Sequence, residues 1–250
     1  MSSASPHSGP ASLGAARFAT TSWSVVAAAQ DPASPLAQDA LAALCDSYWY
    51  PLYAYIRRQG HSADQAEDLT QEFFARLLEK DFLAAVDRGR GKFRSFLLAA
   101  CAHFLANERD RARTWKRGGR SRVVSLDFKT AEARYDQEPS HQLTPDRLFA
   151  RRWGLTLLEQ VVTRLRQDWT ARGKGRLFDR LRVCLLGDKE VVPQARLADE
   201  LAMTQGAVRV AVHRLRQQFR ELLREEIART VEDPEHIEDE IRDLFAALRD

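Results

Sequence analysis

Apolar residues recur at helical spacing along almost the whole chain, and this periodicity restricts the chain to folds built from helices. The clearest example is an i, i+4, i+7, i+11 stripe near the C-terminus: Val208, Val212, Leu215 and Phe219. Residues 123–128 are the one short segment that resembles a strand, and they are isolated. Strong helix formers such as alanine, leucine and arginine are abundant throughout. We therefore expect an all-α fold.

Length and composition exclude several classes of protein. The chain has 250 residues and a net charge of +3, and no apolar run approaches the roughly 20 residues that a membrane span needs. The N-terminus is polar and lacks the pattern of a signal peptide. The cysteines are odd in number and lie among apolar neighbours, which argues against a disulfide framework: Cys45, Cys101 and Cys184. These features predict a soluble, reduced, cytoplasmic protein.

Changes in composition divide the chain into two helical domains joined by a flexible linker. The linker is polar and contains prolines and acids, which are typical of connecting segments. The expected segments are a disordered leader at 1–20, a first domain at 21–115, the linker at 116–145, a second domain at 146–228 and an acidic C-terminal helix at 229–250.

Local signals predict the helices within these segments. Pro51 should interrupt the first helix, because proline lacks the backbone donor, and Ser62 should cap the next one. The expected helices span 36–48, 52–59, 63–79, 93–113, 146–169 and 174–186. The acidic tail has an apolar face with which it should dock on the rest of the protein: Ile237, Ile241, Leu244, Phe245 and Leu248.

Residues 196–220 contain two helical patterns separated by a tight turn. Thr204 is placed to cap the second helix, whose apolar stripe leaves basic residues such as Arg209 and Arg214 on other faces. This pattern is typical of a DNA-binding helix-turn-helix. An antiparallel helical hairpin without a DNA-binding role would give similar spacing.

The acidic helix at 63–79 has two apolar strips. Leu69, Phe73 and Leu77 form one strip, and Phe74 and Leu78 form another among acids. The helix could therefore be packed between two neighbours, or it could present an exposed apolar strip to a protein partner. A third alternative is a metal site formed by carboxylates: Asp64, Glu67, Asp68 and Glu72.

Positive charge is concentrated at residues 87–122, which carry eleven basic and three acidic residues, a net charge of +8. Such a segment favours phosphate binding through counterion release. Trp115 lies beside basic residues and could stack on an unpaired base, while His103 and Asn107 lie one helical turn apart. The alternative is a solvated helix end.

Three motifs together resemble the extracytoplasmic-function sigma factors, which direct bacterial RNA polymerase to promoters. Residues 66–74 read AEDLTQEFF and resemble the family's AEDLxQExF helix. Residues 93–113 resemble the FRxWLxxIAxNxxxDxxR helix that follows it. Residues 197–216 read LADELAMTQGAVRVAVHRLR and resemble the family's helix-turn-helix, IAxxLGIxxGTVxSRLHRAR.

The resemblance implies that the first domain binds core RNA polymerase and opens the promoter at its −10 element. Docking on the polymerase would fall to Asp64, Glu67, Asp68, Gln71 and Phe74. DNA contacts of this domain would come from Arg94, His103, Asn107, Arg109, Arg113, Lys116 and Arg117. The chain differs from the motif here, with Phe96, His103 and Asn107 where the family often has Trp, Asn and Asp.

The same resemblance implies that the second domain binds the −35 element. Base contacts would come from Gln205, Arg209, Val210 and His213, and phosphate contacts from Thr204, Arg214, Arg216 and Arg220. Val210 and Ala211 replace the usual Ser-Arg, so the promoter sequence could differ. No catalytic residue, cofactor or metal is needed, because the polymerase performs the chemistry.

Other functions are consistent with parts of the pattern. A stand-alone helix-turn-helix repressor or activator would account for residues 196–220 alone, and a metal-dependent nuclease would use the carboxylates of the acidic helix. The linker and tail exceed the minimal two-domain plan of the family. They leave open whether an anti-sigma factor regulates the protein or the acidic tail does so by covering the basic surface of the second domain.

Overall fold

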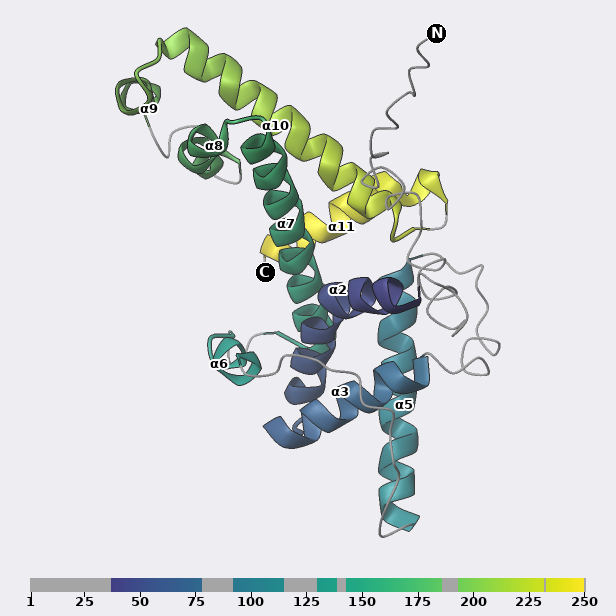
Figure 1. Ribbon diagram of the computed structural model, residues 1–250. Coiled ribbons are helices and arrows are strands. Elements are labelled where there is room, and N and C mark those ends of the chain that lie inside the picture. Colours follow the sequence, from purple (N-terminus) through teal and green to yellow (C-terminus); the bar gives the residue numbers. More distant parts are fainter. Residues whose placement is uncertain are drawn as a thin grey trace, which may run out of the picture.

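The computed structural model describes residues 37–77, 92–114, 130–138, 143–185, 193–231 and 233–249. Within these ranges the regular secondary structure is helical, apart from one isolated bridge between Lys92 and Val231, so the predicted all-α fold is confirmed. Residues 123–128 and the leader at 1–20 lie outside the described residues. The helices form an elongated molecule in which one long central helix, α7, connects two groups of helices (Figure 1).

Helix α2 (Ala37–Arg58) is continuous through Pro51, and the predicted interruption is therefore wrong. A proline inside a helix costs about 3 kcal/mol. Burial on both sides of Pro51 offsets this cost, because Tyr50, Leu52, Tyr53 and Ile56 are all almost inaccessible to solvent. The tertiary environment thus overrides the local signal.

Helices α2, α3 (Ala63–Leu77) and α5 (Phe93–Thr114) pack around an aromatic core. The rings of Phe73 and Phe104 lie 5.7 Å apart, and those of Tyr48 and Phe93 lie 5.3 Å apart. Ser62 caps α3 as expected: the Gln65 amide donates to Ser62 Oγ at 3.3 Å, and the Ser62 amide donates to Gln65 Oε1 at 3.1 Å. This reciprocal cap fixes where α3 begins.

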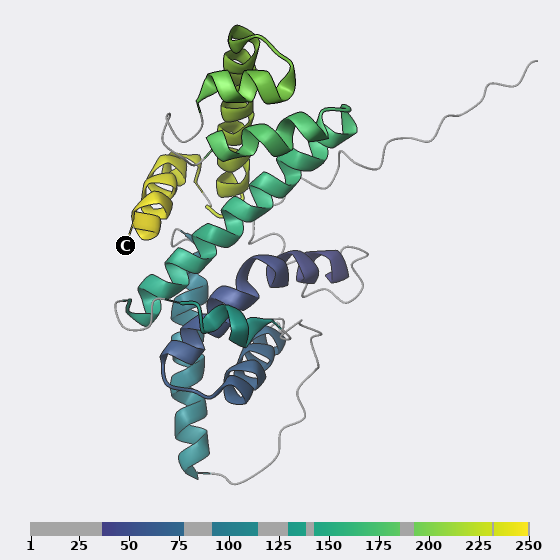
Figure 2. The same ribbon diagram turned by 90° about the vertical axis from the view of Figure 1, so that its left-hand side faces the viewer.

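Helix α7 (Pro145–Ala171) spans about 40 Å at 1.5 Å per residue. Its first half packs on α2, and its second half packs on α8 (Gly175–Leu181) and α10 (Gln205–Ala228). Trp169 donates to Gln218 of α10 at 2.8 Å. The two parts that we expected to be separate domains share one continuous core. Helix α7 runs from one part to the other and connects them (Figure 2).

The described residues 130–138 of the connector, the segment 116–145 between the two parts, are more ordered than their composition indicates. They contain a short helix, α6 (Ala131–Tyr135), which is bound to α2. Glu132 accepts hydrogen bonds from Tyr53 at 2.6 Å and from Arg57 Nε at 3.0 Å. Long-range ion pairing therefore orders residues 130–138, which we expected to be part of a flexible linker.

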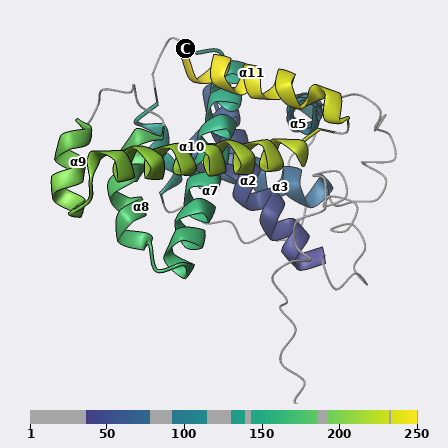
Figure 3. The same cartoon turned by 90° about the horizontal axis from the view of Figure 1, so that it is seen from above.

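The second part ends in three further helices. The expected helix at 174–186 is shorter, because α8 gives way to a 3₁₀ turn, η2 (Arg182–Cys184). Helix α9 (Gln194–Leu201) precedes α10, and the turn η3 (Pro234–His236) leads into α11 (Ile237–Arg249). Seen from above, α11 runs beside the second half of α10 and passes over the start of α5 (Figure 3).

Candidate nucleic-acid interface

Helices α9 and α10 are joined by a turn of three residues, 202–204. Ala202 adopts the left-handed conformation with φ of 50°, and the Met203 amide donates back to the carbonyl of Ala198 at 2.9 Å. Thr204 caps α10, as predicted, by accepting a hydrogen bond from the Ala207 amide at 3.2 Å. These three residues therefore end α9 and cap the start of α10, with no longer loop between the two helices.

The apolar stripe of α10 faces the core. The buried residues of this stripe are Val208, Leu215 and Phe219, and they pack with Leu197 and Ala198 of α9. Their burial fixes the rotation of α10 about its axis. The residues on the remaining part of its circumference consequently face solvent.

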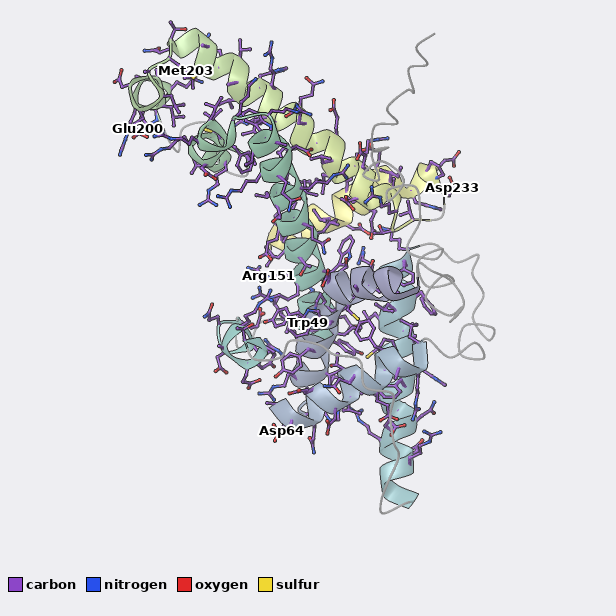
Figure 4. The ribbon with its side chains drawn as sticks, viewed as in Figure 1. Trp49, Asp64, Arg151, Glu200, Met203 and Asp233 are labelled. Atoms are coloured by element: carbon purple, nitrogen blue, oxygen red, sulfur yellow. The ribbon has the colours of Figure 1, made fainter. Side chains whose placement is uncertain are left out.

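Most of the predicted DNA-contacting residues lie on this exposed part of α10. Exposed side chains belong to Thr204, Gln205, Arg209, Val210, His213, Arg214 and Arg220. Val210 is 51% exposed, which is unusual for a valine in a helix whose other large apolar residues are mostly buried. The start of α10 lies at one end of the elongated molecule, near the labelled Glu200 and Met203 (Figure 4).

Arg216 differs from the rest of this set. It is partly buried, and its Nε donates to the carbonyl of Cys184 at 2.8 Å. The predicted phosphate contact by Arg216 is therefore not supported by the geometry. The residue instead holds α10 against the end of the η2 turn, because a carbonyl at a helix end lacks an intrahelical donor.

The far end of α5 presents a second polar surface. His103, Asn107 and Arg109 are exposed, with Asn107 Nδ2 3.3 Å from His103 Nδ1 and Arg109 donating to Gln59 at 2.8 Å. The side chain of Arg113 is not described, and Trp115, Lys116 and Arg117 lie outside the described residues. This surface and the start of α10 lie at opposite ends of the molecule (Figures 1 and 2).

Arg94, which we predicted to contact DNA, is bound within the protein. Its guanidinium donates to Glu240 Oε2 of α11 at 3.0 Å and to Asp243 Oδ2 at 3.3 Å, and it lies 5.0 Å from the ring centroid of Trp153. Lys92 binds the same two acids. The predicted DNA contact by Arg94 is not supported by the geometry, because the acidic tail already occupies its hydrogen-bonding groups.

Phe74 of α3 is also placed differently from our expectation. Its side chain is 0% exposed, because α3 is packed between α2 and α5, so the predicted exposure of Phe74 is wrong. Leu78, the other member of that strip, lies outside the described residues. The outer face of α3 is polar, with Asp64 and Asp68 exposed and Glu67 and Gln71 half-buried. In the described part of the chain, no three His, Cys, Asp or Glu side chains are arranged to hold a metal ion.

The sequence did not reveal a group of charged and aromatic residues between α2, α6 and α7. Tyr50 donates to Glu138 at 2.9 Å, Arg152 pairs with the same carboxylate, and the Arg134 guanidinium lies 4.0 Å from the Tyr50 ring centroid. Burial, followed by the charge of Glu138, raises the pKa of the Tyr50 hydroxyl well above its usual value. This group secures the connector, and its members are too far apart in sequence to be paired from spacing.

The comparisons with known proteins give no family assignment: no family model matches the chain, and neither curated proteins nor solved structures show a significant match. Among the described helices, none combines the length and the apolar character that crossing a membrane requires.

Proposed function

We propose that the protein is a transcription initiation factor of the extracytoplasmic-function sigma type, which binds core RNA polymerase and recognises promoter DNA at two elements. The observation that carries this proposal is the exposed face of α10. Packing turns its apolar stripe inward and leaves three arginines and a histidine in solvent along residues 209–220, on a helix that starts at a capped turn. This is the arrangement by which a recognition helix enters the major groove.

The residues of α10 divide by chemistry into two roles. Gln205, Arg209 and His213 lie on successive turns and can donate to base edges, while the exposed methyl groups of Val210 suit a thymine methyl. Thr204, Arg214 and Arg220 suit phosphate contacts, which set the register of the helix on the duplex. Arg216 is not included, because it binds the Cys184 carbonyl.

The end of α5 is the proposed second contact with DNA. His103, Asn107 and Arg109 are exposed there, and the basic segment 115–122 follows directly in the sequence. Opening a duplex costs a few kcal/mol for each unstacked base. Stacking and phosphate contacts to the separated strand can offset that cost.

Polymerase docking is proposed for the polar outer face of α3. Asp64, Glu67, Asp68 and Gln71 remain candidates because they reach the surface, whereas Phe74 supports α3 from inside. Carboxylates at a protein interface chiefly contribute register and association rate. We therefore expect this surface to bind a basic or amide-rich partner surface.

The test is reconstitution of the full-length chain with core RNA polymerase, followed by run-off transcription from promoters of the source organism. Asp68→Ala and Gln71→Ala should each weaken co-purification with core enzyme, and Asp136→Ala, which removes an exposed acid from the connector, should not. A chain that neither binds core enzyme nor changes where initiation occurs would refute the proposal.

The rival function, a stand-alone repressor or activator, predicts a different result. A repressor would bind a specific duplex tightly without polymerase, and Arg209→Ala would abolish that binding. A sigma factor should require core enzyme for specific binding. Gel-shift measurements with and without core enzyme distinguish the two.

A further inference from the structure

Helix α11 contacts three elements that belong to different parts of the molecule. Its buried residues Ile237 and Leu244 face the core. Leu244 and Leu248 lie over Gly154 of α7, where a β-carbon would be 3.6 Å from either side chain. The helix also packs on α10, and its carboxylates reach the start of α5.

The contact between α11 and α5 is a partly buried ionic cluster. Glu240 is 0% exposed, and the Lys92 ammonium lies 2.9 Å from its Oε2 while Arg94 donates to both of its oxygens. Asp243 binds the same two cations. A buried carboxylate is strongly destabilising without partners, so Glu240 ties the position of α11 to that of α5.

The main chain adds a second connection at the same place. The Phe93 amide donates to the carbonyl of Thr230 at 3.0 Å, and Lys92 and Val231 form an antiparallel bridge. Thr230 lies two residues beyond the end of α10 at Ala228. The end of α10 and the start of α5 are thus joined by backbone bonds beside the ionic cluster.

We propose that α11 is a brace that fixes the distance and orientation between the exposed start of α10 and the exposed end of α5. The brace itself follows from the packing, and its effect on promoter choice rests on the proposed function. The two surfaces lie at opposite ends of a body that α7, α11 and the Phe93–Thr230 bond hold together (Figure 1). They would accept two DNA elements only at a narrow range of separations, because each added base pair moves the second element by about 3.4 Å and turns it by about 35°.

The first experiment measures the brace without DNA or polymerase. Spin labels on cysteines introduced at Ala106 of α5 and Ala207 of α10, both exposed, report the distance between the two surfaces, with Cys184 changed to serine. The labelled wild-type chain should give one narrow distance distribution by double electron–electron resonance. A broad distribution in the wild-type chain would overturn the proposal.

The variants test whether the ionic cluster is responsible. Glu240→Gln with Asp243→Asn should broaden the distribution. Asp239→Asn should not, because among the described residues this α11 acid pairs within its own helix, with Arg242. Asp243→Asn alone is the second variant if the double variant fails to fold, since Asp243 is half-exposed. Equal widths in the wild type and in every folded variant would overturn the brace.

The second experiment measures promoter choice in run-off transcription with core polymerase, using promoters whose spacer differs by single base pairs. We expect transcription by the wild type to fall about tenfold when the spacer changes by one base pair from its best length, which is the effect of one lost base contact. For the double variant, the same change in spacer should lower transcription by less than about threefold. An equal rise in transcription at all spacer lengths in the double variant would show that α11 inhibits the protein, and this would overturn the brace. Absence of transcription at every spacer would instead refute the proposed function, and the distance distributions would still decide the brace.

Discussion

Replacing Ala202 by glycine should stabilise the protein. Ala202 has φ of 50° and ψ of 44°, and within the described residues no other residue except glycine has a positive φ. The left-handed conformation costs an L-residue about 1–2 kcal/mol because its β-carbon crowds the carbonyl oxygen. Glycine avoids this crowding. Its greater conformational freedom in the unfolded chain reduces the gain in the free energy of unfolding by about 0.5–1 kcal/mol.

The expected net effect of Ala202→Gly is about 0.5–1 kcal/mol of added stability, because the exposed methyl group of Ala202 contributes little packing. For a chain of this size that corresponds to a rise in Tm of about 1–4 °C. Urea unfolding followed by far-ultraviolet circular dichroism measures the free energy of unfolding directly.

The matched control is Ala106→Gly, at an exposed position in the interior of α5. There the same chemical change should cost about 1 kcal/mol, because glycine is a poor helix former. The two substitutions should therefore move the urea midpoint in opposite directions. A decrease for Ala202→Gly comparable to that for Ala106→Gly would show that the turn does not hold residue 202 in the left-handed region.

Three further results are expected. Phe74→Ala should cost about 3–5 kcal/mol in urea unfolding, as for other buried aromatic residues; a cost below about 1 kcal/mol would mean that the ring is exposed after all. In the folded protein Cys184 should react fastest of the three thiols with an aromatic disulfide reagent, because it is only partly buried whereas Cys45 and Cys101 are buried. Burial, with a nearby acid, raises the pKa of Cys45 to about 12, and burial raises that of Cys101 further. Equally rapid reaction of all three thiols without denaturant would contradict the packing. A lysine hydrogen bond holds the pKa of Asp243 below its unfolded value of about 3.9, so its contribution to stability is present above that pH and is lost as the pH falls below it. The urea midpoint of Asp243→Asn should accordingly depend less on pH below about 4 than that of the wild type, and identical pH profiles would contradict this contribution.

Features of α10 that depend on nearby residues were predictable from the sequence. Thr204 caps a helix that begins at the next residue, and Val208, Leu215 and Phe219 are buried because a 3.6-residue period places them on one face. Both depend on residues within a few turns. The exposed arginines follow from the same period, since burial of one face leaves the other outside.

Features that depend on distant neighbours were not predictable. Pro51 signals a break, but the residues that bury its helix come from elsewhere in the chain. Phe74 belongs to a strip that could face either a partner or another helix, and only the positions of α2 and α5 decide between them. Arg94 belongs to a basic segment of the sequence, yet its carboxylate partner, Glu240, lies 146 residues further along the chain.

That separation has a consequence for synthesis on the ribosome. Glu240 follows Arg94 by 146 residues, so at about 5–20 residues per second it is translated roughly 7–30 s later. During that interval the first helices can pack, while the guanidinium of Arg94 and the α7 surface around Gly154 still lack the helix that covers them. The nascent chain therefore exposes a cationic and apolar surface until α11 emerges, and a chain truncated before α11 would keep that surface exposed permanently.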